Sequence, residues 1–320
     1  MRRSLVNVLV IVSLLVAGMA LAAAGGAAGE ESAESYWKQG FEHFYKGQHD
    51  QAMADFNQAI KLDPNFAKAY IGRGSCYFTK GQLDQAMADF NQAIKLDPNL
   101  AKAYGNRGSC YARKGQFDLA MADFNQAIKL DPNLAKAYIG RGSCYVDKGQ
   151  LDQAITDYTK ALEINPRDET AYYRRGLVYF KKGQYDQAVA DYTKALEINP
   201  KYWYAYNGRS LVYFQKKQWD KAIADYNKAL EINPRSAYCY THRGFAYHQK
   251  GQVDQAIADY NKALEIDPRG ALAYEGRAEA YFYLKKYDQA WEDVRQAQNL
   301  GEKINPKFLQ DLRQASGRQN

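Results

Sequence analysis

The chain of 320 residues is 46% apolar and 25% charged, and its 27 tyrosines outnumber its 13 phenylalanines. This composition excludes a disordered or collagen-like chain, and four cysteines are too few for a disulfide scaffold. A formal net charge of +7 is modest for this length, so charge alone does not indicate nucleic-acid binding.

The first segment of the chain has the pattern of an export signal. Residues 1–29 contain no acid and only two charges, Arg2 and Arg3, and no residue of 5–24 is charged. A basic start, an apolar core and a small-residue end predict a secretory signal peptide over 1–24, followed by a linker over 25–32. An uncleaved signal anchor is the alternative, because roughly 20 apolar residues can span a bilayer. Both place the remainder outside the cytoplasm, in the periplasm or secreted, and the anchor adds membrane association through residues 5–24.

A 34-residue period begins at Ala33. Seven prolines, from Pro64 to Pro268, are each 34 residues apart. With positions numbered 1 to 34 from Ala33, tyrosine occupies position 4 and alanine positions 20 and 27 in all eight units, and glycine occupies position 8 in six. The predicted units are 33–66, 67–100, 101–134, 135–168, 169–202, 203–236, 237–270 and 271–304.

Each unit is predicted to form two amphipathic helices. Positions 4, 8 and 11 recur at helical spacing, as do positions 20, 24 and 27. Glycine at position 15 in six units supplies the left-handed backbone that ends the first helix. Aspartate at position 18 is expected to cap the second helix, and the Asp-Pro or Asn-Pro pair at positions 31 and 32 to start the next first helix.

This pattern resembles the tetratricopeptide repeat family over residues 33–304. The resemblance implies an all-α fold in which antiparallel helix pairs stack into a right-handed superhelical solenoid with a concave groove. After the last unit, Asn305-Pro306 predicts a further helix to about Gln314, and we expect residues 305–320 to form a capping helix and tail.

Charged residues also recur with the period. Arginine at position 7 in seven units and aspartate at position 23 in eight predict an Arg–Asp ladder, whose pairs lie either within units or between them. A column of arginines that binds anionic ligands is the rival interpretation. The cysteines replace small buried residues of the first helices and are expected to be structural thiols, and histidine spacing predicts no metal site.

The resemblance places binding residues on the inner face of the first helices, at positions 2, 5, 6, 9, 12 and 13. A chaperone C-terminal carboxylate clamp is excluded, because no consecutive set of its residues occurs. Six tyrosines fall outside the packing positions, namely Tyr45, Tyr173, Tyr202, Tyr204, Tyr238 and Tyr283. The predicted groove residues are Lys68, Ser75, Lys102, Asn106, Ser109, Lys136, Ser143, Tyr173, Phe180, Tyr204, Phe214, Tyr238, His242 and Phe282.

Together these patterns predict an exported, non-enzymatic scaffold or adaptor. It would bind a protein or peptide in its concave groove and support assembly of an envelope complex. No catalytic residue, cofactor, metal or nucleic-acid partner is expected, since no nucleophile and base stand out and export opposes nucleic-acid binding. The alternative is a membrane-anchored accessory subunit of an enzyme or of a polysaccharide-export or secretion machine.

Overall fold

The computed structural model describes residues 32–318, and all regular secondary structure in this stretch is helical. The predicted signal peptide or anchor lies outside the described residues. Between residues 32 and 318, no helix is both long enough and apolar enough to cross a membrane. The all-α prediction is therefore confirmed for the repeat region.

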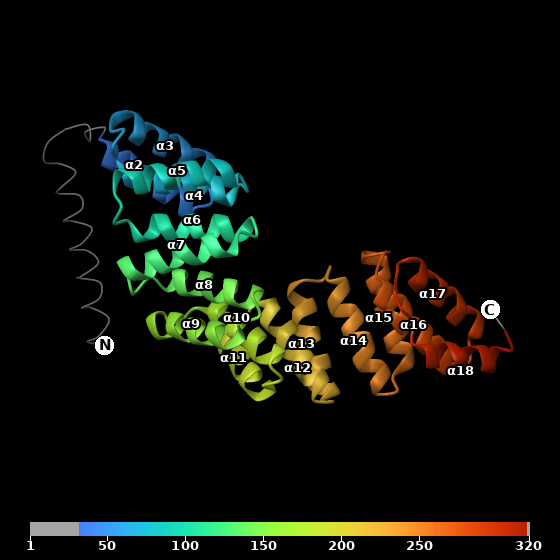
Figure 1. The fold of residues 1–320 in the computed structure, drawn as a ribbon. Helices are drawn as coiled ribbons and strands as arrows, with labels where there is room; N and C mark the ends of the chain where they lie inside the picture. The colour runs from blue at the N-terminus through green and yellow to red at the C-terminus, as the bar shows by residue number, and fades with distance from the viewer. Residues whose placement is uncertain (1–31, 319–320) are drawn as a thin grey trace, which may run out of the picture. The chain divides into compact units, whose positions relative to one another are not determined.

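The two helices of a repeat follow one another along the chain (Figure 1), and they pack against each other in the first, second and fourth to eighth repeats. The first helices of the repeats are α2 (Ala33–Tyr45), α4 (Ala67–Thr79), α6 (Ala101–Arg113), α8 (Ala135–Asp147), α10 (Glu169–Lys181), α12 (Trp203–Gln215), α14 (Ala237–Gln249) and α16 (Ala271–Tyr283). The second helices are α3 (His49–Leu62), α5 (Leu83–Leu96), α7 (Phe117–Leu130), α9 (Leu151–Ile164), α11 (Tyr185–Ile198), α13 (Trp219–Ile232), α15 (Val253–Ile266) and α17 (Tyr287–Asn299).

The chain divides into two compact units after Lys114. Helices α2 to α6 belong to the first unit and α7 to α17 to the second, which also contains α18 (Pro306–Ser316). The candidate binding surface described below, which runs from Tyr173 to Glu302, lies in the second unit.

The turn inside each repeat depends on position 15. Six glycines there have positive φ angles between 72° and 76°, as the sequence predicts. In the sixth and eighth repeats Lys217 and Lys285 take the same left-handed conformation, with φ of 56° and 58°. A side chain with a Cβ is strained in this region, so these two turns keep their shape against a local cost.

Two capping predictions are wrong. The N-cap of the second helices is the residue at position 16 of the repeat, for example Gln150, whose side chain makes no capping bond. Asp152, at position 18, lies in the first turn and pairs instead with Lys182 of the next repeat. At the repeat junction, Asp63 ends α3, and its carboxylate accepts from the Asn65 amide at 2.9 Å. The Asp-Pro pair therefore shapes the connecting turn by side-chain-to-backbone bonding, and the next helix begins at residue 67.

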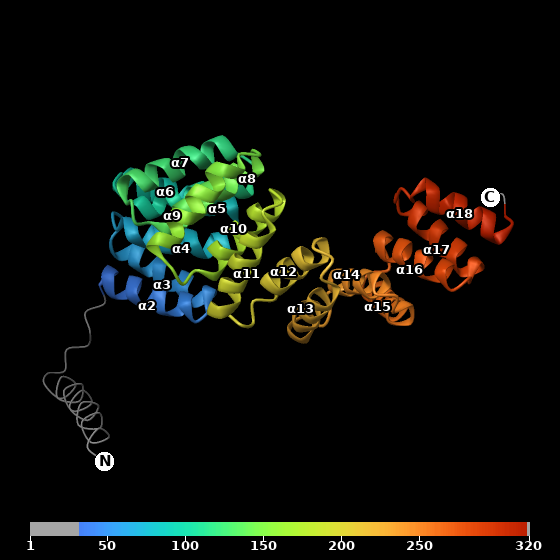
Figure 2. The ribbon, with the colours of Figure 1, turned by 90° about the horizontal axis from the view of Figure 1, so that it is seen from below.

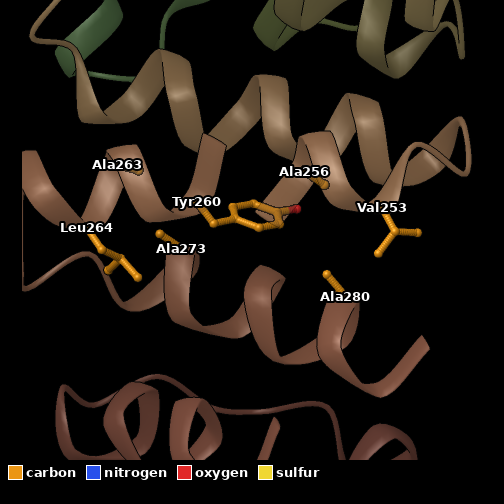
Figure 3. Packing of buried hydrophobic residues seen from close by; sticks show 7 residues of the cluster. All are labelled: Val253, Ala256, Tyr260, Ala263, Leu264, Ala273 and Ala280. Carbon is orange, nitrogen blue, oxygen red and sulfur yellow. The ribbon is translucent and has the colours of Figure 1, made fainter. Parts of the chain in front are cut away.

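In the first, second, fourth, fifth and seventh repeats the core is a ring at position 24 packed against the glycine at position 8. The position 24 rings are almost completely buried, as are the alanines at positions 20 and 27. In the seventh repeat Tyr260 lies between α15 and α16, beside Ala256 and Ala273 (Figure 3). A Cβ added to Gly244 would come within 2.7 Å of this ring, so glycine at position 8 allows the close approach.

The last helix covers the end of the array, as predicted. Helix α18 lies against α17 in both views (Figures 1 and 2). Leu312 is fully buried in a cluster with Trp291, and Phe308 and Leu309 pack around them. Asn305 caps α18 by accepting from the Lys307 amide, with proline at the first helical position. Burying this apolar stripe closes the exposed end of the last pair.

Candidate functional site

The arginines at position 7 are held inside the array by an Arg–Asp ladder. Arg209 donates through Nε and Nη2 to the two carboxylate oxygens of Asp225, at 2.8 and 2.9 Å. Its Nη1 donates to Thr193 of the preceding repeat at 2.9 Å. The pairs observed within repeats are Arg73–Asp89, Arg141–Asp157, Arg175–Asp191, Arg209–Asp225, Arg243–Asp259 and Arg277–Asp293. A guanidinium with three internal bonds joins two repeats and is not offered to a ligand.

In the first repeat a histidine replaces the arginine as partner of the aspartate at position 23. Gln39 stands where the other repeats have arginine, and His43 replaces tyrosine at position 11. The Nδ1 atom of His43 lies 2.6 Å from Asp55 Oδ2. Asp55 has no arginine partner within its own repeat, and His43 therefore takes that place. Sequence reasoning missed this pair, although the two exceptions in one repeat were its signal.

Tyrosines at positions 4 and 11 enclose the ladder. The guanidinium carbon of Arg209 lies 5.8 Å from the ring centroid of Tyr206 and 6.0 Å from that of Tyr213. The same arrangement surrounds Arg243, with Tyr240 and Tyr247. Cation–π contact and ring packing thus explain most of the tyrosine excess as structure.

The predicted polar groove residues fall into two groups. Lys68, Lys102 and Lys136 are exposed, and Lys68 Nζ lies 5.6 Å from the Trp37 ring centroid. The three predicted serines are bonded internally, because each donates to the carbonyl four residues earlier: Ser75 to Ile71, Ser109 to Gly105 and Ser143 to Ile139. Asn106 also donates to Ser75, at 3.3 Å. The serine hydroxyls therefore already have hydrogen-bond partners within their own helices or in a neighbouring repeat.

The predicted phenylalanines at position 12 pack against the second helix of their own repeat. Phe214 meets Trp219 edge to face with centroids 4.8 Å apart. Phe180 packs on Tyr185 and Phe282 on Tyr287, both with centroids 5.9 Å apart. All three are half-buried, and these contacts fix the angle between paired helices.

The remaining predicted residues gather in one place, which we name the aromatic stripe: Tyr173 of α10, Tyr204 of α12, and Tyr238 and His242 of α14. Tyr173 and Tyr204 have ring centroids 5.9 Å apart, and Tyr238 stacks on His242 at 3.9 Å. Tyr204 and Tyr238 are each 45% exposed, which is unusual for rings held against other rings. Tyr202 also packs on Tyr173, whereas Tyr45 and Tyr283 are exposed outside the stripe, beside Phe41 and His248 respectively.

Burial sets the protonation of the stripe. It raises the pKa of Tyr238 to about 12, and nearby Cys239 and Tyr173 act in the same direction. Burial lowers the pKa of His242, although a bond from its Nδ1 to the Tyr238 carbonyl opposes this. Tyr238 and His242 are therefore uncharged at neutral pH, within a partly exposed aromatic surface.

Three tyrosine hydroxyls are buried in the repeats that carry this surface. Tyr192, Tyr226 and Tyr260, all at position 24, have hydroxyl oxygens with no hydrogen-bond partner among residues 32–318. The Tyr192 ring is 5.9 Å from Tyr173, and the Tyr226 ring is 6.4 Å from His242. Ser210 is near Tyr226 but donates to the Asn207 carbonyl at 2.7 Å.

A buried polar atom without a partner normally costs stability, so these hydroxyls require a reason. In the fourth repeat, by contrast, Tyr158 has one, since its hydroxyl lies 3.1 Å from that of Ser143. The change at position 9 from serine to leucine or phenylalanine was the sequence signal for the orphaned groups, and sequence reasoning did not use it.

The cysteines behave as structural thiols. All four are free and fully buried. Burial raises the pKa of Cys76, Cys110 and Cys144 to about 11, so the reactive thiolate is scarce at neutral pH.

Comparison with known proteins supports the repeat assignment. Models described as TPR repeat match residues 40–80, 142–183, 211–251 and 246–285. Models described as tetratricopeptide repeat match residues 67–100, 101–134, 170–202 and 191–224. A search of curated proteins finds no match.

Solved structures share the fold at low identity. A chain of the APC/C hetero-tetramer Cut9-Hcn1 has a TM-score of 0.65 and 19% identity, over 83% of this chain and 52% of its own length. This chain thus spans about half the length of that relative. A tetratricopeptide repeat protein from Parabacteroides merdae has a TM-score of 0.56 and 24% identity, over 79% and 99% of the two chains.

A structure from Pseudomonas aeruginosa, described as pilF, has a TM-score of 0.61 and 18% identity, over 67% of this chain and 97% of its own length. At these identities the likeness concerns the fold alone. The family matches and the repeated helix pairs agree along the chain. It therefore belongs to the tetratricopeptide repeat family.

Proposed function

We propose that this chain is an exported, non-enzymatic scaffold that binds a protein or peptide across the first helices α10, α12 and α14. The aromatic stripe would be the contact surface, within the concave groove that the family fold implies. Its role would be to hold parts of an envelope complex together.

The observation that carries this proposal is the exposure of the stripe in repeats that bury unpartnered hydroxyls. Aromatic rings supply large contact areas at low entropic cost, and they are enriched where proteins bind one another. Two of the rings are 45% exposed, whereas the arginines of the ladder and the serines of position 9 already have internal partners. Apart from the exposed lysines at position 2, the part of the first-helix face that has contacts to spare is thus aromatic, which suits an extended peptide.

The test is a pull-down from envelope extract with the wild-type chain and the double variant Tyr204→Ala/Tyr238→Ala. We expect specific partners to be lost, because truncation removes the two most exposed rings of the stripe. Tyr283→Ala is the matched control, since Tyr283 is 66% exposed on α16 but lies outside the stripe. Equal recovery of the same proteins by the double variant and the control would refute the assignment.

Export is a separate part of the proposal and rests on residues 1–24. N-terminal sequencing of the mature protein tests it. A start after Ala22 or Ala24 supports the exported scaffold. An intact Met1 together with membrane fractionation supports the alternative, a membrane-anchored accessory subunit of an enzyme or of a polysaccharide-export or secretion machine. An intact Met1 in the cytoplasmic fraction would contradict both.

A further inference from the structure

The face that carries the aromatic stripe continues onto α16, where its chemistry changes. Glu275 and Glu279 occupy positions 5 and 9 of the last repeat, so their i, i+4 spacing places both on one face of the helix. The other repeats have no acid at either position. Phe245 of α14 lies against Gly276 of α16, and Gly276 lies between the two glutamates in sequence. This contact joins the face of the glutamates to the face that carries the stripe.

Three glutamates, Glu275, Glu279 and Glu302, make up what we name the acidic end: the first two share one face of α16, and the charge of Glu302 acts on Glu275. All three are partly buried, and between residues 32 and 318 no basic side chain forms an ion pair with any of them. Burial raises the pKa of Glu275, and the charges of Glu279 and Glu302 raise it further. Burial also raises the pKa of Glu279. Burial and mutual repulsion both disfavour the charged form of these carboxylates, and a bound cation would stabilise it.

A separate observation places an unused polar atom beside the acidic end. Tyr260 is fully buried, and its hydroxyl has no partner in the described chain. A Cβ added to Gly276, which lies between the two glutamates in sequence, would be 2.7 Å from the tip of the Tyr260 ring. Figure 3 shows the Tyr260 hydroxyl directed toward the side of Ala256 and Ala280. The negative charge of Glu279 acts on this hydroxyl and raises the pKa of Tyr260 after burial has done so. A partner for this oxygen must come from outside the described residues.

We propose that the acidic end binds a lysine or arginine side chain of the peptide whose apolar residues pack on the aromatic stripe. This inference rests on the proposed function and adds its charge specificity. A metal ion is not the better occupant, since the described residues contain no group of acids, histidines or cysteines placed to hold one.

The spacing of the two surfaces restricts the peptide further. Neighbouring packed helices lie about 10 Å apart, and an extended chain advances about 3.3 Å per residue. One step from α14 to α16 therefore corresponds to about three residues. The basic residue should lie about three positions from the apolar residue that contacts Tyr238.

The probe is a set of immobilised, acetylated and amidated decapeptide pools. Leucine is fixed at the fifth position of every pool, and lysine, norleucine or glutamate is fixed at one other position in turn, with the remaining positions randomised. The full chain is tested as wild type and as Glu275→Gln/Glu279→Gln. Glu292→Gln is the matched control, because Glu292 is exposed on α17 of the same repeat. Circular dichroism checks that the fold and its thermal midpoint are retained.

We expect the wild type to prefer lysine over norleucine about three residues from leucine by about tenfold, the ratio that one charged hydrogen bond contributes. The double glutamine variant should lose this preference and keep its retention of leucine-containing pools, while the control behaves as the wild type. A preference for glutamate, no preference, or a lysine preference that survives in the glutamine variant would overturn the acidic end and leave the proposed function standing. Failure of the wild type to retain any pool would refute peptide binding itself.

Discussion

The fourth repeat (α8 and α9) and the seventh (α14 and α15) have the same internal contacts. Arg141 pairs with Asp157 at 2.7 Å, and Arg243 pairs with Asp259 at 2.6 Å. In each repeat a glycine at position 8 faces a buried tyrosine at position 24. These contacts recur because the two helices can approach only where a small residue meets a ring.

The difference between the two repeats that bears on binding lies at outward positions of the first helix. The fourth repeat has Lys136 at position 2 and Ser143 at position 9, whereas the seventh has Tyr238 and Phe245. The exchange of serine for phenylalanine removes the partner of the buried tyrosine hydroxyl and extends the aromatic surface. The packing positions are thus under the same constraint in both repeats, and the surface positions are free to differ in what they bind.

The largest expected effect tests whether the fourth and seventh repeats depend equally on the Arg–Asp ladder. Asp157→Ala and Asp259→Ala should each lower the free energy of unfolding by about 3–5 kcal/mol, because each leaves a buried guanidinium without its anion. Urea unfolding followed by circular dichroism measures this. Asp152→Ala is the control, since its carboxylate is 85% exposed beside Lys182 and should matter little. If the two buried aspartates differed widely in effect, the repeats would not share one scaffold.

A smaller effect should separate the two repeats. Tyr158→Phe is expected to destabilise the chain by about 1 kcal/mol, because it removes the bond to Ser143. Tyr260→Phe should leave the free energy of unfolding unchanged or raise it, because it removes a buried hydroxyl without a partner in the described chain. Thermal and urea unfolding of both variants give the comparison. Equal losses would show that Tyr260 has a partner, such as an ordered water, and would remove one support of the acidic end.

A third effect, of similar size, concerns the turn that both repeats share. Gly149 and Gly251 have φ of 74° and 75°, and Lys217 holds the same turn in the sixth repeat with φ of 56°. Lys217→Gly should therefore stabilise the chain by about 1 kcal/mol, and Gly251→Ala should destabilise it by a similar amount. Thermal unfolding checks the opposite signs. A loss of stability in Lys217→Gly would mean that the lysine side chain contributes more than its backbone strain costs.

Much of the fold could be predicted from sequence because the repeat averages out local ambiguity. Eight copies of the alanines at positions 20 and 27 identify the helix faces more firmly than one copy would. The caps were harder, because Asp152 is as suitable for an N-cap as for an ion pair. The choice was decided by Lys182, a residue of the following repeat that no local rule considers.

The candidate site was predictable only in part. Four of the six tyrosines left over from packing, Tyr173, Tyr202, Tyr204 and Tyr238, lie in or against the aromatic stripe, so exclusion from the repeat pattern was a useful signal. The serines and Phe214 share the predicted face but have internal partners that sequence spacing does not show. The acidic end was overlooked, because two glutamates in one degenerate repeat look like ordinary solvated charges until their burial is known.

The sequence by itself determined the helix pairs, the glycine turns and the residues that fill the space between helices, since these depend on periodicity and on side-chain size. Only the tertiary structure decided which polar groups have partners. The Arg–Asp pairs close within repeats, the His43–Asp55 pair replaces the ladder at its start, and the hydroxyls of Tyr192, Tyr226 and Tyr260 find no partner in the described chain. The physical reason is that a hydrogen bond requires atoms within about 3 Å, and side chains of separate helices are brought to that distance by packing alone.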